Sequence, residues 1–149
     1  MKRILNSSVT FGIILLALFL VGRAFLGPSE APTPSALATP MTLEAAIASA
    51  AEQDKIVFAV ATASWCGPCQ TYKRTTLADE RVQAWLDHNA VGIMIDVDQD
   101  KEDAGRLQVR SMPSTYIIKD GTIVTTFTGV VSKKRLMEAL EPLSIASAD

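Results

Sequence analysis

The sequence predicts an α/β fold in which helices cover both faces of a mixed central sheet. Two short apolar segments, residues 56–61 and 91–97, have the length and composition of buried strands. Segments with helical spacing precede, separate and follow them, and strands that are joined by helices pair in parallel. An Asp-Gly turn at residues 120–121 predicts a hairpin, whose two strands pair antiparallel.

The elements follow one another without internal repeats. The first is a helix over residues 43–53, with Thr42 as its N-cap and apolar side chains on one face. A second helix is expected to begin just after the strand 56–61, since no Gly or Pro occurs between Gln70 and Gly92. Asp79 caps the next predicted helix, over residues 80–88, and a strand over residues 91–97 and a short polar helix over residues 99–108 follow it. The two strands of the hairpin are expected over residues 115–118 and 123–128, and Ser132 caps the last helix, over residues 133–143.

Residues 1–26 have the composition of a signal anchor or a signal peptide. Lys2 and Arg3 precede an apolar run over residues 9–22. Because positive charges stay in the cytoplasm, both interpretations place the rest of the chain outside the cytoplasmic membrane, in the periplasm or on the extracellular side. We favour an uncleaved, single-pass anchor, since the small-x-small site at residues 36–38 lies far beyond the apolar run. A cleaved signal, which would release the protein, and a buried core helix are the alternatives.

Residues 27–40 are predicted to form a flexible linker. They contain four of the seven prolines together with Ala, Ser and Thr, a composition that buries too little apolar surface to offset the entropy lost on folding. The folded domain is then expected to span residues 41–149, tethered close to the membrane surface.

Both cysteines of the chain lie in the segment Trp65-Cys66-Gly67-Pro68-Cys69. A strand before this segment and a helix after it would place Cys66 at a helix N-terminus, where free N–H groups and the helix dipole favour a thiolate over a thiol. Pro68 suits the first helical turn and stiffens the loop, so that Cys69 stays close to Cys66. Two thiols held in this way can open and close a disulfide.

From about residue 41 to residue 143 the chain resembles the thioredoxin family. The W-C-G-P-C motif is identical to that of thioredoxins, and Met112-Pro113-Ser114 resembles the segment whose cis proline faces the cysteines in that family. Gly121 and Gly129 follow at the family's spacing. The resemblance implies a thioredoxin fold, catalysis by the two cysteines, and neither a metal nor another cofactor.

The resemblance also implies a two-step exchange. The Cys66 thiolate attacks a substrate disulfide, and Cys69 then resolves the mixed disulfide; the reverse sequence oxidises a dithiol. Five residues are expected to contact substrate, namely Trp65, Gly67, Pro68, Met112 and Pro113. A cis Pro113 would leave the Met112 backbone free to pair with an extended substrate segment, whereas a trans Pro113 would mark an ordinary turn.

The chain departs from the thioredoxin pattern at three places. Val60 stands where thioredoxins commonly carry a buried Asp, and Met94 aligns with that residue's usual lysine partner. Proton transfer at Cys69 would then depend on water or on substrate. Residues 73–86 also lack the proline that kinks the thioredoxin helix. In this respect the chain is similar to the C-terminal thioredoxin-like domains of membrane electron transporters.

These features predict a thiol-disulfide oxidoreductase that acts on protein disulfides or dithiols. Reduction is favoured because Gly67-Pro68 resembles the reducing thioredoxins, and a reductase outside the membrane requires a transmembrane electron donor. The alternatives are an oxidant of folding proteins, a metal module in which the two cysteines bind Cu(I) or share a Zn site, and a binding domain whose disulfide regulates docking.

Other patterns predict no further site. Asp96, Asp98 and Asp100 resemble the start of a calcium loop, but Lys101 stands where that loop needs Gly, so a solvated strand end is favoured. His88, the single histidine, is expected at a helix end. A net charge of −2 gives no indication of nucleic-acid binding.

Overall fold

A computed structural model describes residues 11–19 and 30–144 of the chain. Residues 11–19 are helical, and their large apolar side chains are exposed. Among the described residues, none of the helices combines the length and the apolar character needed to cross a membrane. The signal anchor or signal peptide expected over residues 1–26 lies largely outside the described residues.

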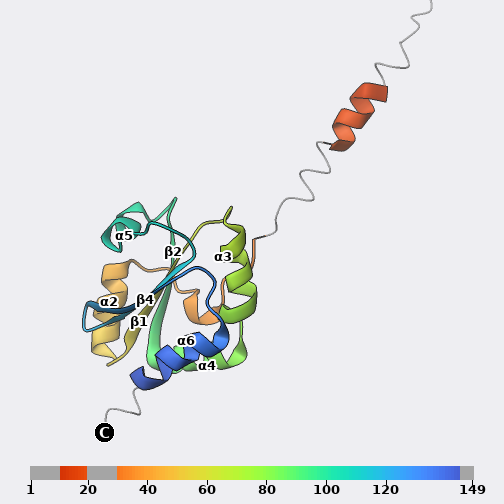
Figure 1. Ribbon diagram of the computed structural model, residues 1–149. Coiled ribbons are helices and arrows are strands. Elements are labelled where there is room, and N and C mark those ends of the chain that lie inside the picture. The colour runs from red at the N-terminus through yellow and green to blue at the C-terminus, as the bar shows by residue number, and fades with distance from the viewer. Residues whose placement is uncertain (1–10, 20–29, 145–149) are drawn as a thin grey trace, which may run out of the picture.

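Four strands form one mixed sheet (Figure 1). They are β1 (Ile56–Thr62), β2 (Ala90–Asp96), β3 (Ser114–Lys119) and β4 (Thr122–Thr128), in the spatial order β2-β1-β3-β4. β1 pairs with β2 in parallel, whereas β1 with β3 and β3 with β4 pair antiparallel. The mixed sheet that the sequence predicts is confirmed, with strand ends that shift by one residue or a few.

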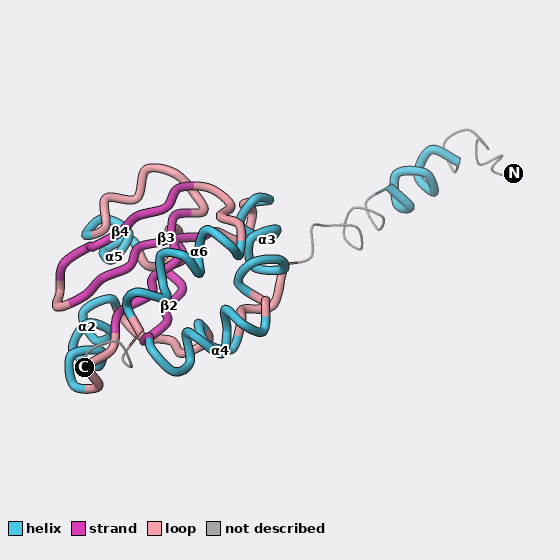
Figure 2. The backbone as a smooth tube through the Cα atoms, turned by 60° about the horizontal axis from the view of Figure 1, so that its bottom comes forward, coloured by secondary structure: helices cyan, strands magenta, loops and turns pink. Residues whose placement is uncertain are grey.

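Helices cover both faces of this sheet (Figures 1 and 2). On one face lie α3 (Gly67–Tyr72), α4 (Glu80–Asn89) and α6 (Lys133–Leu140), and on the other lie α2 (Leu43–Glu52) and α5 (Lys101–Arg106). Two short 3₁₀ turns, η1 (Ser35–Leu37) and η3 (Glu141–Leu143), lie near the two ends of residues 30–144. The predicted N-caps are confirmed, since the side chains of Thr42, Asp79 and Ser132 accept backbone N–H groups of α2, α4 and α6.

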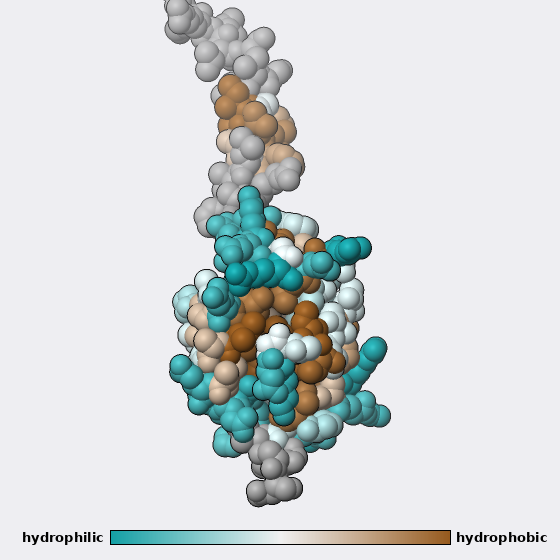
Figure 3. Space-filling model, turned by 90° about the vertical axis from the view of Figure 1, so that its left-hand side faces the viewer, coloured by the Kyte–Doolittle hydropathy of each residue, from teal (hydrophilic) through white to brown (hydrophobic). Residues whose placement is uncertain are grey.

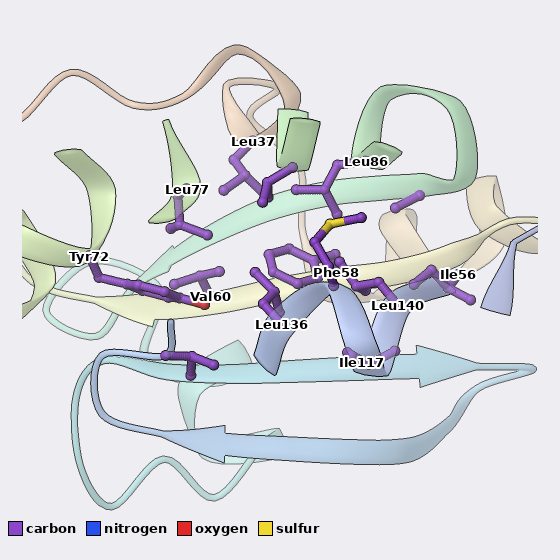
Figure 4. Packing of buried hydrophobic residues seen from close by; sticks show 14 residues of the cluster. Leu37, Ile56, Phe58, Val60, Tyr72, Leu77, Leu86, Ile117, Leu136 and Leu140 are labelled. Atoms are coloured by element: carbon purple, nitrogen blue, oxygen red, sulfur yellow. The ribbon is translucent and has the colours of Figure 1, made fainter. Parts of the chain in front are cut away.

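The central strand β1 divides the core into two layers. All seven of its residues are buried, and successive side chains point to opposite faces. Ile56, Phe58 and Val60 pack with α3, α4 and α6 (Figure 4), whereas Val57, Ala59 and Ala61 pack with α2 and α5. Because both faces of β1 are buried, the C-terminal end of this strand is a rigid support for the loop that follows it.

The helix that begins at the cysteine motif does not continue as a plain α-helix. After α3 it widens into one π-type segment, η2 (Lys73–Leu77). Thr75 donates its hydroxyl to the carbonyl of Thr71 (2.8 Å), and buried Thr76 donates to the carbonyl of Val131 in the loop before α6 (2.6 Å). The threonine hydroxyls thus tie this stretch of helix to its own backbone and to a neighbouring loop.

Residues 30–40, which we call the strap, are packed against the domain and begin the folded unit. Ala31, Pro34 and Leu37 are buried, and Leu37 is only 2% exposed in the cluster that contains Leu77 and Leu86 (Figure 4). The predicted flexible linker over residues 27–40 is therefore wrong for residues 30–40, and the domain starts earlier than residue 41. The prolines that suggested a linker also restrict the backbone, which lowers the entropy cost of docking.

The strap crosses β2 at Gly92. A Cβ atom at Gly92 would collide with the backbone carbonyl of Ala36 and with the side chain of Leu37. Next to this crossing, Gln83 of α4 accepts hydrogen bonds from the Ser35 hydroxyl and the Ala36 N–H, each 2.9 Å long. A glycine in β2 and one polar side chain in α4 therefore fix the strap in place.

An apolar hollow opens on the side of the molecule that carries α2 and α5 (Figure 3). A pocket between α2 and the hairpin of β3 and β4 is lined by apolar side chains such as those of Ile47, Val57 and Ile118, with charged residues around them. Val57 stands near the start of β1, whereas the cysteines follow the end of that strand. This pocket is therefore remote from the cysteines.

Candidate active site

The cysteines lie where β1 ends and α3 begins. Cys66 is the N-cap of α3, and Cys69 lies in its first turn, joined to Cys66 by a disulfide with an S–S distance of 2.02 Å and a Cα–Cα distance of 5.2 Å. Cys66 is 6% exposed and Cys69 only 1%. Cys66 is therefore the more exposed residue of a largely buried pair, which suits the role of attacking cysteine that the family resemblance implies.

One backbone donor points at the Cys66 sulfur. The N–H of Cys69 points at Cys66 Sγ, with a nitrogen–sulfur distance of 3.2 Å. The N–H of Cys66 itself donates to the carbonyl of Ala63 (3.2 Å), which fixes the loop between β1 and α3. When the disulfide opens, a thiolate at Cys66 faces a backbone donor at a helix N-terminus, which stabilises negative charge there.

A second loop brings Met112 and Pro113 to the cysteines. The Met112–Pro113 peptide bond is cis, and the Met112 side chain packs against the cluster of Ala63, Cys66 and Cys69. The carbonyl of Pro113 accepts the N–H of Gly129 (2.7 Å), which fixes the loop after β4 beside the cis peptide. Two segments far apart in the sequence thus meet at the disulfide, in the arrangement that the resemblance implied.

Trp65, Gly67 and Pro68 form the exposed part of the motif. Trp65 is 66% exposed, and its indole Nε1 donates to Asp98 Oδ2 at 2.8 Å. Asp98 follows the end of β2, and the C-terminal ends of the parallel strands β1 and β2 meet at the same edge of the sheet. Sequence reasoning considered Asp98 only as a calcium-loop residue or a solvated strand end, although this shared edge could have identified it as a partner of Trp65.

A pair of buried hydroxyls lies beside Val60. Tyr72 of α3 makes a 3.2 Å hydrogen bond with the hydroxyl of Thr115, which is the cross-strand partner of Val60 on β3. The ring of Tyr72 reaches toward Val60 (Figure 4). Burial raises the pKa of Tyr72 to about 12, and the bond to Thr115 offsets part of that effect. The layer where thioredoxins commonly carry a carboxylate is thus occupied by a valine and two neutral hydroxyls.

Tyr72 predicts a specific alkaline destabilisation. Tyr72 keeps its proton up to about pH 12 in the folded state but only up to about pH 10 in the unfolded state. The ionisation of Tyr72 therefore leaves the free energy of unfolding unchanged below pH 10 and lowers it between pH 10 and 12. Tyr72→Phe removes this loss, on the order of 2 to 3 kcal/mol, but leaves the Thr115 hydroxyl unpaired at neutral pH, which costs about 1 kcal/mol or more. Urea unfolding should therefore show Tyr72→Phe less stable at pH 7, with a gap that narrows above pH 10; a constant gap would contradict the prediction.

The acidic residues after β2 form a turn. Asp98 donates its N–H to the carboxylate of Asp96 (2.9 Å), and Asp96 donates its N–H to that of Asp100 (2.8 Å). Over residues 11–19 and 30–144, no group of three or more His, Cys, Asp or Glu side chains is arranged to hold a metal ion.

Comparison with known proteins agrees with this geometry. Residues 38–119 match a family model described as thioredoxin-like. The chain is 36% identical to a thioredoxin of Bacillus subtilis over 90 residues, which cover 60% of this chain and 84% of the relative. It is 34% identical to thioredoxin 1 of Synechococcus elongatus over 79 residues, covering 53% and 71%.

Solved structures show the same fold. A thioredoxin from Thermus thermophilus matches with a TM-score of 0.61 at 21% identity, over 72% of this chain and 87% of that one. The germline-specific thioredoxin Deadhead of Drosophila melanogaster matches with a TM-score of 0.59 at 27% identity, over 72% and 99%. The chain has the thioredoxin fold and a C-x-x-C disulfide, and it belongs to the thioredoxin-like family of thiol-disulfide oxidoreductases.

Proposed function

We propose that this protein reduces protein disulfides outside the cytoplasmic membrane, to which its N-terminal segment anchors it. The observation that carries the proposal is the disulfide at the N-terminus of α3, which packs against Met112 of the cis Met112–Pro113 peptide. The Gly67-Pro68 pair between the cysteines and the similarity to proteins named thioredoxins favour reduction over oxidation.

Reduction proceeds by two displacements at sulfur. In the first, the thiolate of Cys66 attacks one sulfur of the substrate disulfide, a mixed disulfide forms, and the other substrate sulfur leaves as a thiolate. In the second, the thiolate of Cys69 attacks Cys66 Sγ, the Cys66–Cys69 disulfide forms, and the remaining substrate sulfur leaves. The substrate gains two electrons and the protein loses two. A dithiol donor must then return the pair to the reduced form.

The surface around Cys66 suits an extended substrate segment. The exposed ring of Trp65, the residue before Cys66, is held by Asp98 and would supply a flat apolar contact for substrate. Met112 packs against the cysteines, and its backbone would pair with the substrate chain. Gly67 and Pro68 are exposed and add no bulky side chain that would block approach.

The proposed location rests on the N-terminal sequence. Lys2 and Arg3 precede the apolar run, and the apolar side chains of residues 11–19 are exposed on a helix. A reductase in that location needs electrons from the cytoplasm, so we propose a transmembrane electron donor as its partner. Protease added to spheroplasts tests this placement: the domain should be digested without lysis, whereas protection until lysis would overturn it.

The direction of electron flow is tested by the redox equilibrium of the cysteine pair. The full chain in detergent is equilibrated with graded dithiothreitol or glutathione buffers, and the oxidised fraction is counted after thiol labelling. A potential near the thioredoxin value of about −270 mV supports the reductase. A value near about −120 mV, the range of strong oxidants, would instead make the protein an oxidant of folding proteins.

A further inference from the structure

Gln70, the residue after Cys69, is a buried amide with three hydrogen bonds. Its side chain belongs to a residue that is only 4% exposed. The Nε2 group donates to the carbonyls of Ala63 (3.3 Å) and Ser64 (3.2 Å), and Oε1 accepts the backbone N–H of Ala31 at 2.7 Å. One helical side chain therefore joins the loop that leads to Cys66 with the strap.

The hydrogen-bond pattern requires an amide in one orientation. The Nε2 group of Gln70 lies within hydrogen-bond distance of two carbonyls, and its oxygen faces a donor. The flipped amide would place oxygen against two carbonyls and NH₂ against the N–H of Ala31. A carboxylate would likewise meet two carbonyl oxygens, and an apolar side chain would leave all three backbone groups without these bonds.

These bonds hold the two cysteines relative to each other by a route that does not include the disulfide. Gln70 extends from the helix turn that carries Cys69, whereas Ala63 accepts the N–H of Cys66 and packs with both cysteines. The amide of Gln70 therefore fixes the loop of Cys66 to the helix of Cys69. The disulfide joins the same loop to the same helix. The amide of Gln70 therefore keeps the two thiols close after the disulfide has opened.

The strap contacts Gln70 and the helix that carries it. Besides the bond from Ala31, the carboxylate of Glu30 pairs with Lys73, one turn further along the helix, at 3.3 Å. The Lys73 side chain is only 4% exposed, so this ammonium group is largely shielded from water. Two consecutive strap residues thus contact two residues on the helix that carries Cys69.

We propose that Gln70 is a positioning residue for thiol-disulfide exchange and that the docked strap acts through it. By keeping the two thiols close in the reduced protein, the amide raises their effective concentration toward each other and favours ring closure to the disulfide. A dithiol that closes readily is a stronger reductant. The inference rests on exchange at Cys66 and Cys69 but not on its direction or location, so it can fail while the proposed function stands.

The test is the equilibrium of the full chain with dithiothreitol in detergent. Gln70→Met keeps the volume and removes the three bonds, and Ala31→Pro removes the single N–H of the strap that reaches Gln70. We expect Gln70→Met to shift the equilibrium constant toward the dithiol about tenfold, or about 30 mV, and Ala31→Pro about threefold in the same direction. Ala31→Gly, which keeps the N–H, is the matched control and should stay within about twofold of the parent.

A double-mutant cycle separates positioning from general loosening. If the strap acts through Gln70, Ala31→Pro adds no shift in a chain that already carries Gln70→Met. Additive shifts, or an unchanged equilibrium constant in folded Ala31→Pro, would overturn the proposal. Should Gln70→Met fail to fold, Ala31→Pro against Ala31→Gly decides the question, because both leave Gln70 in place.

Discussion

Replacing Cys66 with serine should abolish the reduction of a protein disulfide such as insulin, with a loss of about 10³-fold or more. Cys66 is the more exposed residue of the pair, and the N–H of Cys69 points at its sulfur. A serine hydroxyl at this position is not ionised near neutral pH and cannot attack a disulfide. The rate of insulin precipitation in the presence of dithiothreitol measures the effect.

Cys69→Ser gives the matched comparison. Cys66 can still attack, but no thiol remains to resolve the mixed disulfide, so a covalent adduct with the substrate should accumulate and appear by mass spectrometry under non-reducing conditions. A binding domain whose disulfide only regulates docking would behave differently. It would show no turnover in the parent protein, and Cys66→Ser would leave its affinity for a partner intact.

The predictable part of the fold is the part with local signals. The apolar run of β1, the Asp-Gly hairpin and the N-caps at Thr42, Asp79 and Ser132 each depend on neighbouring residues, and the structure contains all of them. The pairing of the two cysteines also followed from local sequence, whereas the cis proline came from a family resemblance, since nothing in the spacing alone brings Met112 to Cys66.

The parts that sequence reasoning missed depend on contacts between distant segments. The bond from Trp65 to Asp98 and the bond from Ala31 to Gln70 join segments that are 33 and 39 positions apart, and neither pair belongs to a periodic pattern. The strap was misjudged for a second reason. Composition averages over a segment, whereas its docking depends on one leucine, Leu37, and on the glycine that it crosses, Gly92.

Leu37 gives the largest expected effect on stability. Its side chain is 2% exposed and packs in the cluster of α4 and β1 that contains Leu86 and Phe58. Leu37→Ala should therefore lower the free energy of unfolding by about 2 to 5 kcal/mol, the range for a buried leucine that leaves a cavity. Val130→Ala, at a position 46% exposed, is the control and should change it by less than about 0.5 kcal/mol.

Urea unfolding of the full chain measures both variants, and the midpoint and slope show whether the transition stays cooperative. If the strap were a flexible linker, Leu37→Ala would have no more effect than the control. Gly92→Ala tests the same contact from the side of β2. The added Cβ would collide with the backbone of Ala36, which cannot move aside as a flexible side chain would. Both Leu37→Ala and Gly92→Ala should weaken docking of the strap, and each should then also shift the cysteine equilibrium toward the dithiol, because the strap holds Gln70.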